Sequence, residues 1–210
     1  MKLSIVNRFS FGYIKSLKIV KEEQPEKWGF FCNSVPLFSV VSNYILAAFL
    51  SFIKYNRIIR RSKVRYLVIW NKDGSRIVQA LDEIFGFSID TKIKAHVCVT
   101  PLYIRDIERK YFLIPTNSDE NRILEIITHE LSHFYFYHCY TSAYDSKRFW
   151  YISELIVPKI LEKIFGQTIT SKSSYVGEPT LEESKLISDW IDKKITFQEF
   201  LDLVVKKNEL

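Results

Sequence analysis

The sequence predicts an α+β fold, in which a small mixed sheet precedes most of the helices. Short apolar and β-branched runs, bounded by turn residues, lie between residues 65 and 114 and indicate strands. Beyond residue 117, apolar residues recur at the spacing of amphipathic helices. A hydrophobic content of 47% in 210 residues can form a packed core, and 6 Gly and 6 Pro indicate no long linker. We expect a compact domain over residues 63–210, preceded by an N-terminal segment, residues 1–62.

The N-terminal segment contains a long apolar stretch with two open interpretations. Residues 28–53 carry no charge, and Val35–Ile53 is long and apolar enough to cross a bilayer. Polar residues such as Asn43 and Ser51 interrupt it, and the same stretch would serve equally as a helix that backs the sheet. We favour the backing helix over a membrane anchor. If the stretch does span a membrane, the positive charges after it predict a cytoplasmic C-terminal domain.

A basic run follows the apolar stretch. It carries six cations and no acid: Lys54, Arg57, Arg60, Arg61, Lys63 and Arg65. Such a run can contact an anionic membrane surface or the phosphates of nucleic acid, although cations also occur at solvated helix ends. The three cysteines form no C-x-x-C pair, and the N-terminus has no apolar secretory signal. We therefore expect a cytoplasmic protein, with association at a membrane as the alternative.

The middle of the chain supplies the expected sheet. Arg65–Trp70 has the composition of a buried strand, and residues 71–75 have that of a turn. Apolar residues at helical spacing then predict a helix that ends at Gly86. Two further strands are expected over Ile93–Thr100 and Lys110–Ile114, paired as antiparallel neighbours.

Helices fill the rest of the chain. Asn117 or Ser118 is expected to cap a helix that runs to about Tyr140. A second helix is expected over residues 150–165, ended by Gly166, and a last amphipathic one over residues 181–206 with a break near Lys194.

The first of these helices contains the segment His129-Glu130-Leu131-Ser132-His133. Since an α-helix advances about 100° per residue, the two histidines project from one face, one turn apart, and can hold one metal ion between them. Glu130 lies at the edge of that face, where it can contact a metal-bound water without ligating the metal. This pattern arises by chance in about 1 of 200 chains of such composition, but apolar neighbours predict that the helix is buried, where charged groups are costly.

A catalytic zinc site needs a third protein ligand. Glu154 is the best candidate, because it lies in an apolar helical segment where an unpaired carboxylate would be costly to bury. Asp145, in an expected turn, ranks second. His138 should point about 140° away from the face of the other two histidines, and His96 and Glu178 are weaker alternatives still.

These residues resemble the gluzincin branch of zinc metallopeptidases, which combine H-E-x-x-H on one helix with a glutamate ligand on the next. The resemblance covers residues 65–166 and implies a zincin-like fold, one zinc per chain, and hydrolysis of a peptide or protein substrate. It implies His129, His133 and Glu154 as ligands and Glu130 as general base, and it leaves Tyr175 as a candidate for stabilising the oxyanion. Many gluzincins carry an acid four positions after the ligand glutamate, where this chain has Pro158.

A different function class uses the same ligands without catalysis. A zinc-stabilised binding or regulatory protein could dock on a membrane surface or on nucleic acid through the basic run. Glu130 separates the two classes, because a structural zinc site needs no carboxylate beside its first ligand and closes its fourth position with Cys or His. We therefore favour the metallopeptidase.

Overall fold

The structure, a computed structural model, describes residues 1–6, 22, 44–99, 105–116, 118–140, 146–166 and 178–205. The chain divides into two compact units, which are described one at a time. The sheet unit comprises residues 2–72 and 91–127, and the helical unit comprises residue 1 with residues 73–90 and 128–210. The boundary expected between residues 62 and 63 lies inside one continuous helix, α4, Tyr44–Phe85.

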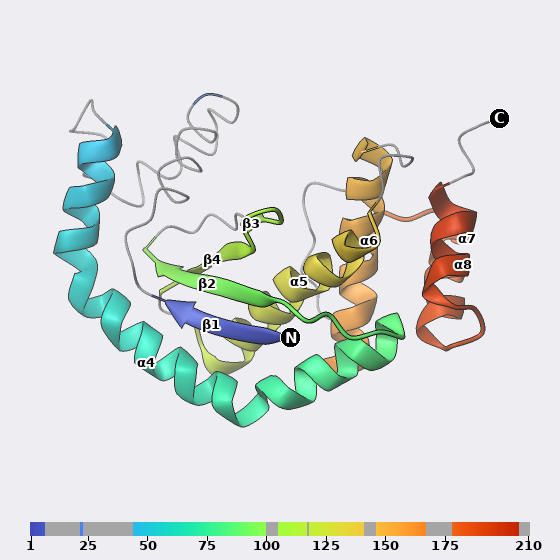
Figure 1. Ribbon diagram of the computed structural model, residues 1–210, viewed down its shortest axis with the longest axis horizontal. Helices are drawn as coiled ribbons and strands as arrows, with labels where there is room; N and C mark the ends of the chain where they lie inside the picture. The colour runs from blue at the N-terminus through green and yellow to red at the C-terminus, as the bar shows by residue number, and fades with distance from the viewer. Residues whose placement is uncertain are drawn as a thin grey trace. The chain divides into compact units, whose positions relative to one another are not determined.

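The sheet unit contains a four-stranded mixed sheet, so that the expected α+β class with a small mixed sheet is confirmed. Its strands are β1 (Lys2–Val6), β2 (Lys92–Cys98), β3 (Arg105–Asp106) and β4 (Tyr111–Pro115), in the spatial order β1-β2-β4-β3 (Figure 1). β1 and β4 both run parallel to β2, and β3 runs antiparallel to β4.

The expected antiparallel pairing of the two central strands is therefore wrong. β2 and β4 are parallel, with Lys94 opposite Tyr111 and Cys98 opposite Pro115. A parallel pair needs a connection that returns the chain to the starting edge, and here that connection includes β3, which adds to the far side of β4. The first strand, β1, is absent from the sequence prediction. Only one of its five residues, Ile5, is buried, so that the strand shows no clear alternation of buried and exposed residues.

The strand expected over Arg65–Trp70 and the turn expected over residues 71–75 are also wrong, because both lie inside α4. The buried positions Ile59, Ser62, Tyr66 and Ile69 follow one another at three- and four-residue intervals, which is the period of a helix. The β-branched residues that suggested a strand partly face solvent, as Val68 does at 66% exposure. Gly86, with φ of +79°, ends α4 as expected.

Tyr66 ties α4 to the end of β4. Its hydroxyl donates to the carbonyl of Pro115 at 2.9 Å and accepts from the backbone N–H of Ser118 at 3.0 Å. The side chain is fully buried. This part of α4 thus contacts the end of β4, and it lies later in the chain than the expected backing helix.

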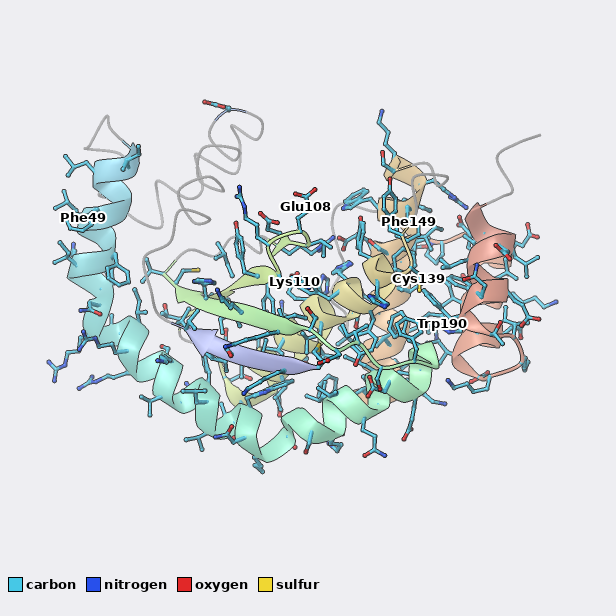
Figure 2. The ribbon with its side chains drawn as sticks, in the orientation of Figure 1. Phe49, Glu108, Lys110, Cys139, Phe149 and Trp190 are labelled. Atoms are coloured by element: carbon cyan, nitrogen blue, oxygen red, sulfur yellow. The ribbon has the colours of Figure 1, made fainter. Side chains whose placement is uncertain are left out.

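Of that expected helix, Val35–Ile53, the first nine residues lie outside the described residues and the rest form the first turns of α4. Ile53 is 55% exposed, and Phe49, which is labelled in Figure 2, is 48% exposed. Within the described ranges, no helix combines the length and the apolarity needed to cross a membrane.

The helical unit contains the end of α4, most of α5 (Glu120–His138), and α6 (Ser146–Phe165), α7 (Leu181–Ile191) and α8 (Phe197–Val205). The expected helices are confirmed here: Gly166 ends α6 with φ of +66°, and the break near Lys194 separates α7 from α8, where Lys193 has φ of +63°.

The cap of α5 differs from both expected candidates. Asn117 lies outside the described residues, and the N–H of Ser118 is bonded to Tyr66. Asp119 caps the helix instead, because its Oδ1 accepts from the N–H of Arg122 at 2.8 Å.

An aromatic core holds the helical unit together. Phe85, at the end of α4, contacts Tyr135, Trp190 and Phe197 with ring centroids 5.1, 5.2 and 4.9 Å away. The hydroxyl of Tyr135 donates to Asp82, and burial together with this bond raises the Tyr135 pKa. The end of α4 is therefore fixed to the helix that carries the histidines.

The start of α7 is joined to α6 by an ion pair. Nη2 of Arg148 lies 2.8 Å from Oε1 of Glu183, and Glu183 also forms a capping box with Thr180. Burial raises the pKa of Glu183, but hydrogen bonds from the Thr180 N–H and from Arg148 outweigh it, so that the pKa lies below its ordinary value.

Candidate metal centre

The two histidines of the motif meet on one face of α5. Their Nε2 atoms lie 3.2 Å apart, and His133 is fully buried whereas the side chain of His129 is 27% exposed. Ile123, Ile127 and Leu131 on the same helix have no measurable exposure, so that α5 is held in the core around this face. The helical period thus places the two imidazoles side by side. The ring of His129 is partly open to solvent, whereas that of His133 is not.

Glu154 approaches both histidines from α6. Its Oε2 lies 3.8 Å from Nε2 of His129, its Oε1 lies 3.6 Å from Nε2 of His133, and its side chain is 11% exposed. With one ligand atom taken from each residue, all three atoms lie within 4.8 Å of one another. Among the described residues, this is the group of His, Cys, Asp and Glu side chains that could hold a metal ion.

The separations suit a single small cation. Zinc binds imidazole nitrogen and carboxylate oxygen at about 2.0–2.2 Å, and tetrahedral angles then place two ligand atoms about 3.4 Å apart. The two imidazole nitrogens are 3.2 Å apart, and each lies 3.6 or 3.8 Å from a different oxygen of Glu154, so that the pairwise separations are close to that value. Among the described residues the cluster offers two nitrogens and one carboxylate, and three protein ligands with an open fourth position are the arrangement of catalytic zinc sites.

Glu130 lies beside this cluster without belonging to it. Its Oε1 is 3.9 Å from Nε2 of His129, and its side chain is 2% exposed. A cation held between the histidines would lie near this carboxylate and would help to offset the cost of burying it.

Aromatic packing fixes α6 against α5 near the cluster. The ring of Phe149, on α6, lies 4.3 Å from that of Phe136 and 5.3 Å from that of Tyr137, measured between centroids. Both partners follow His133 on α5, and Phe149 precedes Glu154 on α6. These contacts hold the carboxylate near the imidazoles. Their one signal in the sequence is the density of aromatic residues around the motif.

Other parts of the chain hold the remaining candidates. His138 is exposed at the end of α5, where its ring lies 5.6 Å from that of Phe87, and it is not in the cluster. His96 lies on β2 in the sheet unit, and Glu178 is exposed before α7. Asp145 and Tyr175 lie outside the described residues.

Pro158 lies inside α6, four residues after Glu154. The position at which many gluzincins carry an acid is therefore a proline within the ligand helix of this chain.

Comparison with protein-family models, with curated proteins and with solved structures found no match. The resemblance to gluzincins stays a prediction that rests on the motif residues and on the geometry around them.

Proposed function

We propose that this protein is a zinc-dependent metallopeptidase with a gluzincin-like site, in which His129, His133 and Glu154 bind one zinc ion. The observation that carries the proposal is the convergence of these three side chains from two helices, with Glu130 buried beside them. Histidine and carboxylate ligands suit zinc, and three protein ligands leave a position for water.

Zinc held by these ligands would supply Lewis acidity that polarises a carbonyl, and it would lower the pKa of a water that it binds to about 7. Glu130 acts as the general base, which takes a proton from the attacking water and passes it to the leaving amine. Its burial suits this role, because few solvent molecules compete with the attacking water for the carboxylate. The partly exposed side of His129 gives a peptide access to the site.

The buried Glu130 also argues against a purely structural zinc site. A structural site is closed by a fourth protein ligand, and the described residues offer no Cys or further His within the cluster. A carboxylate beside an open ligand position is instead the arrangement that water activation requires.

The proposal is tested by measuring the zinc content of the full chain purified without chelators, alongside the hydrolysis of a mixture of denatured proteins. We expect about one zinc per chain and new peptide N-termini detected by mass spectrometry. His133→Ala should lose both zinc and hydrolysis. His138→Ala is the matched control and should keep both, because that side chain lies outside the cluster.

Two outcomes would contradict the proposal. Protein without zinc would remove the metal site itself. Stoichiometric zinc without hydrolysis, in a protein that unfolds when a chelator removes the metal, would identify a zinc-stabilised binding protein instead.

A further inference from the structure

A second surface of the protein lies on α4, within the sheet unit. Its members share the side of the helix opposite the buried stripe; they are Ile53, Arg57, Arg60, Arg61, Val64 and Val68, and together they form the outward face of α4. At about 100° of rotation per residue, all six project within an arc of about 100°. Each of them is exposed.

The outward face is strongly cationic. Lys54 and Arg65 flank its three arginines, and residues 28–72 contain no acid at all. Two contacts are given for these cations within the described part of the chain: Nε of Arg60 donates to Asn56 at 3.1 Å, and Nζ of Lys54 lies 5.4 Å from the ring of Tyr55. Neither partner is an anion, so that the face presents a positive potential to solvent.

Apolar side chains lie at both ends of this cationic region. Ile53 is 55% exposed, and Val64 and Val68 are 63% and 66% exposed. A surface that only kept the protein in solution would not need three large aliphatic side chains among its arginines. Single-stranded nucleic acid is bound largely by stacking of bases on aromatic side chains, and duplexes by polar and cationic groups at phosphates and base edges. None of the six residues of the outward face is aromatic, and half of them are aliphatic.

We propose that the outward face of α4 binds the surface of a membrane that contains anionic lipid. The arginines contact lipid phosphate and carboxylate groups, while Ile53, Val64 and Val68 enter the boundary between headgroups and acyl chains. Such a helix lies in the interface rather than crossing it. This inference is independent of the zinc site, since its residues contribute nothing to the metal cluster.

The test is co-sedimentation of the full chain with vesicles of phosphatidylcholine alone and of phosphatidylcholine mixed with phosphatidylserine. We expect binding to the mixed vesicles only, weakened by salt. The variant R57E/R60E/R61E should bind at least about 100-fold more weakly, since each lost cation removes roughly a fivefold factor and the three glutamates add repulsion. The variant I53S/V64S/V68S should also bind more weakly, with its salt dependence retained.

The matched control is K159E/K163E/K185E, which changes the net charge equally at exposed positions of α6 and α7 and should bind like the parent. An equal loss in this control would reduce the effect to net charge and overturn the proposal.

The proposal would also fail if the parent bound both vesicle types alike, or if it bound a DNA duplex in preference to the mixed vesicles. Association of the free chain through this face, abolished by I53S/V64S/V68S and without vesicle binding, would identify a second copy as the occupant. Circular dichroism establishes that each variant is folded.

Discussion

On α5, His129 and His133 are four residues apart, and on α4, Arg57 and Arg61 have the same spacing. The histidines point to one another and to Glu154, and His133 has no exposed surface. The arginines point to solvent. Equal spacing therefore gives a converging pair in one helix and an open surface in the other.

The difference in burial between these two pairs shows which polar residues indicate a binding site. A buried imidazole or carboxylate loses its hydration on folding, and the loss must be offset by a specific partner. An exposed cation keeps its hydration and costs little wherever it lies. Substitutions in the metal cluster should therefore have large and specific effects, whereas single substitutions on the outward face of α4 should have small ones.

The largest expected effect separates Glu130 from an ordinary acid of α5. Glu130→Gln keeps the size of the side chain but removes the base, so that peptide hydrolysis should fall by about 10²–10⁴ while the zinc content is unchanged. Steady-state kinetics and metal analysis of the same preparation check this. Glu125→Gln, a change of the same kind on the same helix, is the control and should be active; equal losses in both variants would show that Glu130 has no special role.

A smaller effect is expected at the third ligand. Glu154→Gln removes a charged ligand, so that zinc affinity should fall on the order of 100-fold and activity should fall with it. Added zinc should restore part of the activity, because the histidine pair remains. Competition with a chromogenic chelator measures the affinity, and Glu162→Gln on the same helix is the control. If Glu154→Gln binds zinc like the parent and Asp145→Asn does not, Asp145 is the third ligand.

The smallest effect contrasts a buried and an exposed residue within α4. Tyr66→Phe removes a hydroxyl that makes two hydrogen bonds, and leaves the Pro115 carbonyl and the Ser118 N–H without that partner. We expect the free energy of unfolding to fall by about 1–3 kcal/mol in urea titrations. The neighbouring Arg65→Ala should change it by no more than about 0.5 kcal/mol. Equal changes in the free energy of unfolding would contradict the assignment of Tyr66 to a buried face and of Arg65 to an exposed face of α4.

The candidate site was accessible from sequence because its main elements are local. The spacing of His129 and His133 fixes their common face once the helix is recognised, and the apolar surroundings of Glu154 mark it as a carboxylate that needs a partner. The aromatic contacts between α5 and α6 were not accessible, because which rings meet depends on how two helices pack.

The fold was predicted less well where pairing is not local. Parallel and antiparallel arrangements of β2 and β4 require the same residues, and the choice depends on the path of the chain between them. The strand expected at Arg65–Trp70 failed because β-branched and aromatic residues suit a half-buried helix as well as a strand. The burial period of three and four, extending back to Ile59, is the signal that distinguishes the two.

Pro158 gives α6, the helix that carries Glu154, an additional property. It has no N–H to donate to the backbone carbonyl of Glu154, four residues earlier, so that one rung of the helical hydrogen-bond ladder is missing at the turn that bears the carboxylate. The main-chain oxygen of Glu154 retains its lone pairs, and the turn resists bending less than an unbroken helix does. The turn that bears Glu154 can therefore adjust locally, which makes its backbone a compliant support for this carboxylate.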